Sequence, residues 1–326
     1  MKRTIAIVAG GDSSEFPVSL RSAQGLYSFM DKEKYTVYIV EMKGLCWEAV
    51  LPDGNKTAVD RNDFSFLLNG EKITFDFAYI IIHGTPGENG LLQGYFDLLH
   101  IPYSTCDVLA SALTFNKFAL NHYLQGFGIR ISDSLLVRKG SDISDQDVIE
   151  KIGLPCFIKP NEGGSSFGVT KVKTAEQIRP AIEKAMHESD EVIVEAFMAG
   201  TEITCGCYKT RTKEVVFPIT EVVSKNEFFD YAAKYDGESQ EITPARLDDD
   251  TTRRVKTLTS AIYDILGCEG IIRVDYIITE GGKINLLEVN TTPGMTATSF
   301  IPQQVRAAGL DMKDVLTDII ENKFIS

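Results

Sequence analysis

The sequence has no apolar run long enough to cross a bilayer as a helix, so we expect no membrane association. Basic residues are also scarce: 33 Lys and Arg stand against 46 Asp and Glu, for a formal net charge of −13. Nucleic-acid-binding proteins normally carry a basic face, so this balance argues against a nucleic-acid partner. The rest of the composition, 44% apolar and 24% charged, is typical of a globular protein, and 326 residues suffice for two or three domains.

Cysteines are few, and no two have the paired Cys-x-x-Cys spacing of a zinc site. Cys205 and Cys207 fall in a strand-like run, where they would share one face as reduced side chains. We expect all six cysteines to be buried free thiols, which indicates a cytoplasmic protein.

The first strand-to-helix turn lacks the G-x-G-x-x-G fingerprint, which excludes a dehydrogenase of that type. Residues 5–9 read as a buried strand rather than as part of a signal peptide, because glycine and acidic residues follow directly. Strands and helical patterns then alternate to about residue 104, which predicts a parallel α/β domain. Two polar loops, residues 10–15 and 83–90, follow strand ends, where such sheets bind ligands; ordinary capping or glycine turns are the alternative.

Residues 271–290 contain two β-branched, apolar runs on either side of a Gly-Gly turn, which predicts a β-hairpin. Alternation places Arg273 and Asp275 on one face of the first strand, and Glu288 and Asn290 on one face of the second. Such oxygen ligands suit magnesium, which completes its shell with water and nucleotide phosphates. A solvated polar face on an ordinary hairpin explains this segment equally well.

A Gly- and Ser-rich segment, residues 161–168, follows a short strand expected at residues 155–160. Its backbone N–H groups can cradle phosphates, with a flexible hairpin turn as the alternative. Lys159 and Lys117 supply the point charges that suit phosphate. Together with the hairpin, these features predict a magnesium- and nucleotide-dependent α/β enzyme.

Three further segments complete this reading. Residues 221–244 have few strand or helix signals, and a long polar and aromatic loop in a compact domain is usually a functional lid or disordered. A lid would exclude water from a reactive intermediate. Helical periodicity predicts a helix over residues 248–266 and a final amphipathic helical region over residues 301–321.

Residues 288–296, Glu-Val-Asn-Thr-Thr-Pro-Gly-Met-Thr, with Ser299 beyond them, resemble the signature of the D-alanine–D-alanine ligases, members of the ATP-grasp superfamily. The patterns Gly-Gly-x-Ser-x-Glu at residues 10–15 and His-Gly-x-x-Gly-Glu-x-Gly at residues 83–90 match the same family. The resemblance therefore covers nearly the whole chain.

This resemblance implies a Rossmann-like N-terminal α/β domain followed by a two-subdomain ATP-grasp fold. We expect the N-terminal domain to span residues 1–104, the central subdomain 105–192, and the C-terminal subdomain, with the ω-loop and metal site, 193–326. The resemblance also implies a cytoplasmic homodimer that uses ATP, two Mg²⁺ (or Mn²⁺) ions and D-alanine. We expect it to bind neither a membrane nor a nucleic acid.

The family assigns roles on the amino-acid side of the reaction. Glu15 is implied to contact the ammonium of the first D-alanine, with His83 nearby. Arg273 and the Gly294 N–H are implied to stabilise the oxyanion, and Ser299 to hold the carboxylate of the second substrate.

The family also assigns nucleotide and metal contacts. The backbone of Ala196 and Met198 is implied to bind adenine, beside Glu195, while Glu202 holds the ribose. Three lysines are implied to contact the phosphates: Lys117, Lys159 and Lys234. Three side chains of the hairpin are implied to bind the metal: Asp275, Glu288 and Asn290.

Two implied residues belong to loops. Ser165 and Tyr235 are implied to form a hydrogen-bonded set with Glu15. A tyrosine at position 235 favours an amine as the second substrate, because related ligases that make D-alanyl-D-lactate commonly have histidine there.

One departure concerns Phe16 and Pro17, where the family commonly has charged residues. The alternatives are an ATP-grasp ligase for another amino acid, a ligase of the D-alanyl-D-lactate type, and a non-catalytic nucleotide-binding regulator. The last would be expected to lack metal ligands or phosphate-binding lysines, and this chain has them all.

Overall fold

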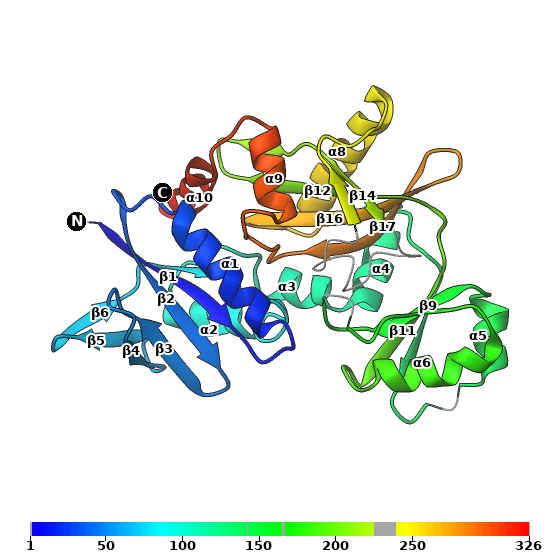
Figure 1. The fold of residues 1–326 in the computed structure, drawn as a ribbon, viewed down its shortest axis with the longest axis horizontal. Coiled ribbons are helices and arrows are strands. Elements are labelled where there is room, and N and C mark those ends of the chain that lie inside the picture. Colours follow the sequence, from blue (N-terminus) through cyan, green and yellow to red (C-terminus); the bar gives the residue numbers. More distant parts are fainter. Residues whose placement is uncertain (1, 142, 165–166, 225–238, 326) are drawn as a thin grey trace.

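The computed structural model describes residues 2–141, 143–164, 167–224 and 239–325, which form three sheets with their covering helices (Figure 1). Within this part of the chain no helix combines the length and the apolarity that a membrane span requires. The three sheets and their covering helices confirm the α/β and α+β class expected from the sequence.

The first sheet has the strand order β6-β5-β4-β3-β2-β1-β7. β1 pairs in parallel with β2 and β7, as the alternating pattern predicts. The parallel pairing does not extend through the whole sheet, because β2 to β6 form an antiparallel meander. Its strands are β1 Arg3–Gly10, β2 Tyr35–Lys43, β3 Cys46–Val50, β4 Lys56–Asp60, β5 Ser65–Leu68, β6 Glu71–Thr74 and β7 Phe77–Ile80.

A tight turn explains part of the meander. Asn69 and Gly70 join β5 to β6 and both have positive φ, at 53° and 85°. This is the pair of conformations that a two-residue hairpin turn needs, and Asn-Gly is its strongest sequence signal. Such a short connection permits only antiparallel pairing.

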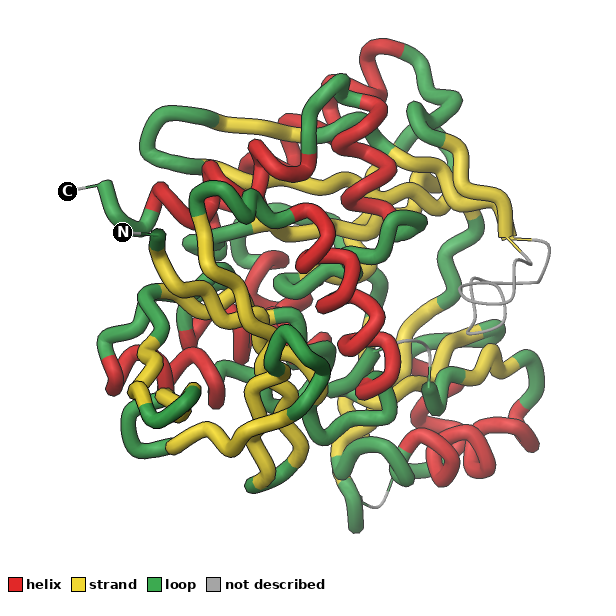
Figure 2. Tube along the Cα trace, turned by 60° about the vertical axis from the view of Figure 1, so that its left-hand side comes forward, coloured by secondary structure: helices red, strands yellow, loops and turns green. Residues whose placement is uncertain are grey.

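Helices from both ends of the chain cover the first sheet. α1 (Phe16–Phe29) packs against β1, while α2 (Leu91–Leu99) follows the loop after β7. The C-terminal α10 (Met312–Asn322) contributes to the same buried core as α1 and β1. Arg3 binds Glu321 at 2.7 Å, so the two chain ends lie close together (Figure 1, Figure 2).

The second sheet is antiparallel, in the order β10-β9-β11-β8, and α6 packs on β9. The loop between β9 and β10 contains the Gly- and Ser-rich segment predicted from the sequence. Its elements are β8 Ser134–Arg138, α5 Asp145–Lys151, β9 Cys156–Pro160, β10 Thr170–Val172, η1 Ala175–Gln177, α6 Ile178–Ala185 and β11 Glu191–Ala196.

The third sheet has the order β15-β14-β12-β16-β17, with β13 also paired to β12. Apolar residues of α8 pack on one face of this sheet in a shared core. α9 packs against β12. The elements are β12 Gly200–Lys209, β13 Glu214–Val216, β14 Thr220–Ser224, β15 Ser239–Ile242, α8 Asp249–Ile265, β16 Ile271–Thr279, β17 Lys283–Asn290 and α9 Phe300–Ala307.

The helical predictions hold, with two additions. α3 (Val108–Phe115) and α4 (Lys117–Gln125) are further helices, which precede the second sheet. The final helical region divides into α9 and α10, with Gly309 between them at φ 72°.

Two other expectations need correction. The loop prediction for residues 221–244 is wrong at both ends, because β14 and β15 pair antiparallel; residues 225–238 lie outside the described part. Five cysteines are buried free thiols as expected, but Cys46 is exposed.

Candidate active site

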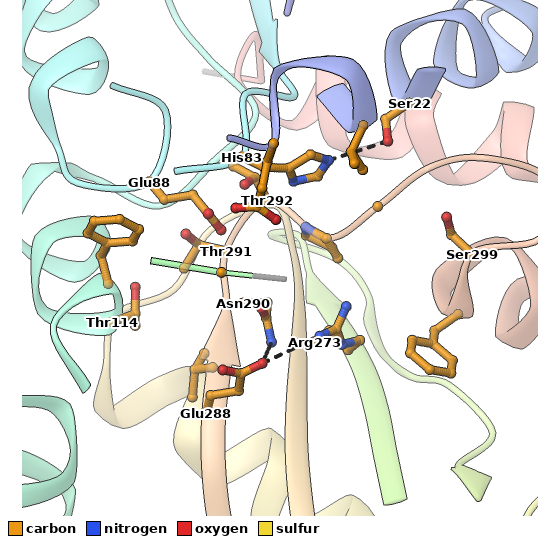
Figure 3. A pocket seen from close by; sticks show the side chains of 18 of the residues that line it. Ser22, His83, Glu88, Thr114, Arg273, Glu288, Asn290, Thr291, Thr292 and Ser299 are labelled. Carbon is orange, nitrogen blue, oxygen red and sulfur yellow. Dashed lines mark hydrogen bonds and ion pairs between the residues drawn. The ribbon is translucent and has the colours of Figure 1, made fainter. Parts of the chain in front are cut away.

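Two cavities adjoin where side chains from the three sheets and their loops meet. The larger, about 640 Å³, is lined by α1, by the loop after β7 and by the segment that follows β17 (Figure 3). The smaller, about 260 Å³, lies between the second and third sheets. They share part of their lining: Lys117, Gly163, Gly164, Arg273, Glu288 and Phe300.

The hairpin of β16 and β17 brings its four predicted side chains together. Arg273 lies opposite Asn290 in the register, and Asp275 lies opposite Glu288. Arg273 donates from Nε and Nη2 to the two carboxylate oxygens of Asp275, at 2.9 and 2.7 Å. Asn290 Nδ2 donates to Asp275 Oδ2 at 3.2 Å and to Glu288 Oε1 at 3.4 Å. The shared polar face predicted from alternation is confirmed.

A β-bulge explains how the hairpin combines this polar face with a continuous core. The register shifts so that Asp275 pairs with Glu288 while Tyr276 pairs with Leu286. Leu287 is therefore the extra residue, and it lines the smaller cavity. The bulge lets Leu286 and Val289 both face the core, although an unbroken alternation would separate them.

The donor set of the hairpin fits a hard divalent cation. Asp275 and Glu288 supply carboxylates and Asn290 supplies an amide, and oxygen ligands of this kind suit Mg²⁺ or Mn²⁺. No three His, Cys, Asp or Glu side chains form a metal-binding group within the described ranges, so the amide is needed to complete this set. To act as a ligand, Asn290 must present its oxygen where it now presents nitrogen.

A buried ion pair occupies the wall of the smaller cavity. Lys159 Nζ lies 2.5 Å from Glu195 Oε2, and the two side chains are only 14% and 8% exposed. Asn121 donates from Nδ2 to Glu195 Oε1 at 3.1 Å. The pairing arises because β9 and β11 are neighbours in the second sheet.

Of the residues expected to bind adenine and ribose, Met198 and Glu202 line the smaller cavity, but Ala196 does not. The Ala196 N–H donates to the Asp133 carbonyl at 2.9 Å, and the Ala196 carbonyl accepts from Ser132 Oγ at 2.7 Å. Its N–H is therefore committed within the chain, while the carbonyl retains a second lone pair.

Lys117 lies at the junction of the two cavities. Its Nζ donates to the Gly163 carbonyl at 2.6 Å, which ties the first turn of α4 to the glycine loop. Burial lowers the pKa of the Lys117 ammonium, and the nearby charge of Lys159 lowers it further, while Glu288 opposes the shift. An anion placed here would relieve that desolvated charge.

Glu15 and His83 are brought together in the larger cavity, and each is 7% exposed. His83 Nε2 lies 3.3 Å from Ser22 Oγ. Burial lowers the pKa of His83, which favours a neutral imidazole. A side chain at Gly164 would approach the Glu15 carboxylate to 2.5 Å, so the glycine permits the loop to lie over Glu15.

Glu88 was not singled out from the sequence, although it lies within the matched 83–90 pattern. Its side chain lines the larger cavity (Figure 3). The Glu88 carboxylate accepts from the Gly84 N–H at 2.7 Å. Burial raises the pKa of Glu88 to about 7, and the negative charges of Glu15 and Glu288 act in the same direction. Groups with such shifted pKa values cluster at functional sites.

The end of the larger cavity is formed by the segment after β17. Gly294 and Ser299 both line it. Ser299 Oγ lies 2.8 Å from Thr296 Oγ1 and accepts from the Thr296 N–H at 3.1 Å, immediately before α9. Three predicted residues, Ser165, Lys234 and Tyr235, lie outside the described residues.

Two family models together match most of the chain. Residues 4–106 match the family model "D-ala D-ala ligase N-terminus", and residues 123–321 match "D-ala D-ala ligase C-terminus". The chain is 79% identical to a protein named D-alanine–D-alanine ligase from Phocaeicola vulgatus, over 99% of this chain and 100% of that one.

Solved structures are similar over the same extent. A VanG D-Ala:D-Ser ligase from Enterococcus faecalis superposes with a TM-score of 0.87 at 31% identity, covering 99% of each chain. A D-alanine–D-alanine ligase from Bacillus anthracis complexed with ATP gives 0.78 at 28% identity, covering 99% of this chain and 97% of that one.

Proposed function

The chain belongs to the D-alanine–D-alanine ligase family, and on that premise we propose that it joins two D-alanine molecules at the expense of ATP. The products are D-alanyl-D-alanine, ADP and phosphate, and the dipeptide supplies peptidoglycan synthesis. The observation that carries the proposal is the pair of adjoining cavities, which meet at Lys117, Arg273 and Glu288. That arrangement suits a phosphoryl transfer from a nucleotide in one cavity to an amino acid in the other.

In the first step, the carboxylate of one D-alanine attacks the γ-phosphorus of ATP, giving an acyl phosphate and ADP. Glu15 holds the ammonium of this D-alanine by a charge-assisted contact. Met198, Glu195 and Glu202 hold the adenosine, and Lys117 and Lys159 the phosphates. Positioning of this kind supplies most of the rate enhancement in phosphoryl transfer.

The smaller cavity must rearrange for that step. Lys159 is paired with Glu195, and Arg273 with Asp275. Nucleotide phosphates would take Lys159 from Glu195, which frees the Glu195 carboxylate to accept a hydrogen bond from the adenine amino group.

In the second step, the amine of the other D-alanine attacks the acyl carbon, and phosphate leaves. Negative charge develops on the acyl oxygen, where Arg273 and the Gly294 N–H donate hydrogen bonds. Ser299 contacts the carboxylate of this second D-alanine. No side chain of the protein forms a covalent bond to substrate.

We assign Asp275, Glu288 and Asn290 to two Mg²⁺ or Mn²⁺ ions. When bound, these ions neutralise charge on the phosphates during transfer. Arg273 would then turn from Asp275 toward the reacting carboxylate.

Several finer assignments extend the proposal. Ser165 and Tyr235 complete a hydrogen-bonded set with Glu15, and Lys234 contacts the γ-phosphate. We divide the chain at residues 104 and 192 into an N-terminal domain and two ATP-grasp subdomains, and place it in the cytoplasm as a homodimer.

Product identification by mass tests the function directly. The protein is incubated with ATP, Mg²⁺ and D-alanine, alone and in competition with D-serine or D-lactate. We expect D-alanyl-D-alanine as the main product in each case, with one ADP per dipeptide. A predominant mixed product, or ADP formation only with other amino acids, would overturn the substrate assignment.

A further inference from the structure

Arg21 is a cation in the larger cavity that neither the sequence motifs nor the reaction scheme has used. It is an exposed residue of α1 that lines the larger cavity but not the smaller one. Val18, Arg21 and Ser22 all line this cavity, at the i, i+3 and i+4 spacing of one helix face. That face of α1 is therefore a wall of the substrate site.

The other cations of the two cavities are engaged by the chain itself. Lys117 donates to the Gly163 carbonyl, and Lys159 pairs with Glu195. Arg273 forms a bidentate ion pair with Asp275. Within the residues that the structure describes, Arg21 has no hydrogen-bond or ion-pair partner, so its guanidinium is available to an anionic ligand.

Close packing on either side of Arg21 holds the backbone of α1 against the segment that contains Met295. The next residue, Ser22, accepts from the Met295 N–H at 3.4 Å through its Oγ. One turn later, a side chain at Gly25 would lie 2.2 Å from the Met295 carbonyl, so α1 and this segment touch backbone to backbone. Because Met295 directly precedes Thr296, α1 carries Arg21 alongside the segment that ends at Ser299.

The carboxylate of the second substrate requires a cationic partner, which Arg21 can provide. Its amine reacts, but its carboxylate passes unchanged into the product and stays ionised throughout. Ser299 is a weak partner by itself, because its hydroxyl is shared with Thr296. A guanidinium matches a carboxylate in both shape and charge.

The carboxylate of the first substrate is a poorer candidate. It must reach the γ-phosphate, at the junction where both cavities are lined by Lys117 and Arg273. Arg21 does not line the smaller cavity, which places it on the side away from the nucleotide.

We propose that Arg21 binds the carboxylate of the second amino acid together with Ser299, and so makes a free carboxylate a requirement for the acceptor. This inference rests on the proposed ligase function. It makes Arg21 a specificity-determining residue that contacts substrate, while ATP and the first amino acid bind without it.

The test compares Arg21→Gln and Arg21→Lys with the unaltered enzyme. D-alaninamide has no carboxylate to phosphorylate, so it enters the reaction only as acceptor. Its use is measured against that of D-alanine by dipeptide mass, and ADP release gives the KM for ATP and for each amino-acid site.

For Arg21→Gln we expect the acceptor KM to rise about tenfold or more, since a charge-assisted contact is lost, with the KM for ATP unchanged. Preference for D-alanine over D-alaninamide should fall by a similar factor. Arg21→Lys should recover part of the acceptor affinity and part of the preference for D-alanine, because lysine keeps the charge but not the bidentate geometry.

Arg61→Gln serves as the matched control, because Arg61 is exposed and lines neither cavity. An Arg21→Gln enzyme that makes dipeptide with unchanged acceptor KM and unchanged preference overturns the inference alone. Loss of ATP affinity together with a lower melting temperature would mark Arg21 as structural and overturn it too. Failure of the unaltered enzyme to make dipeptide would instead refute the proposed function.

Discussion

In the smaller cavity Lys159 and Arg273 are paired with carboxylates of the chain itself, at 2.5 and 2.7 Å. In the larger cavity Arg21 has no such partner among the described residues, and the Glu88 carboxylate lies near the like charges of Glu15 and Glu288. Arg273 lines both cavities, so the contrast lies between the Lys159–Glu195 pair, which lines only the smaller cavity, and Arg21, which lines only the larger one.

The difference bears on how each cavity selects its ligand. A nucleotide must exchange existing ion pairs for new ones, so the smaller cavity stays neutralised until phosphates and metal arrive. The larger cavity is lined by Glu15 and by Arg21, and an amino acid brings one ammonium and one carboxylate that these two side chains can bind. We therefore expect substitution of the ion-paired Arg273 and substitution of Glu88 in the larger cavity to have different effects on activity and stability.

Arg273→Ala should have the larger effect. It removes an oxyanion donor, which commonly lowers kcat about 10²–10³-fold, and it leaves the Asp275 and Glu288 carboxylates without their cation. Phosphate release with ATP and D-alanine measures the loss.

Arg254→Ala is a suitable control, because Arg254 donates to the Gly282 carbonyl at the turn of the same hairpin and lines neither cavity. It should retain most activity. Turnover by Arg273→Ala within a few-fold of the unaltered enzyme would contradict the assigned role.

Glu88→Gln should have a smaller effect that depends on pH. The folded pKa of Glu88 is about 7, against 4.5 for an ordinary glutamate. Between these values the unfolded chain loses the proton that the folded chain keeps, so stability falls as pH rises through this window. Glutamine keeps the hydrogen bond from Gly84 and has no such dependence.

Between pH 5 and pH 8 the variant should therefore gain about 1–3 kcal/mol in free energy of unfolding relative to the unaltered protein. Urea denaturation at both pH values measures the difference. A constant offset across this range would mean that Glu88 ionises normally in the folded protein.

Alternation of side chains along the strands predicted the part of the site that lies on the hairpin of β16 and β17. Alternation along β16 and β17 was enough to place Arg273, Asp275, Glu288 and Asn290 on one face. The meander was missed even though its turn, Asn69-Gly70, has a clear hairpin signature. The bulge at Leu287 was not foreseen, because a single extra residue changes no motif.

Tertiary contacts account for the rest. Nothing in the sequence links Arg21 to Ser299, since their proximity depends on how α1 packs against Met295. The shifted pKa of Glu88 likewise depends on burial and on charges brought in from distant segments. The ion pair of Lys159 with Glu195 joins two strands whose order in the sheet the motifs do not specify.

The most direct test of the exchange between paired and free charges is a crystal structure with Mg²⁺ and a non-hydrolysable ATP analogue. We predict the nucleotide in the smaller cavity, with Lys159 moved from Glu195 to the phosphates and two Mg²⁺ ions held by Asp275, Glu288 and Asn290. A nucleotide seated elsewhere, with the Lys159–Glu195 and Arg273–Asp275 pairs intact and the three hairpin side chains away from any metal, would contradict the account.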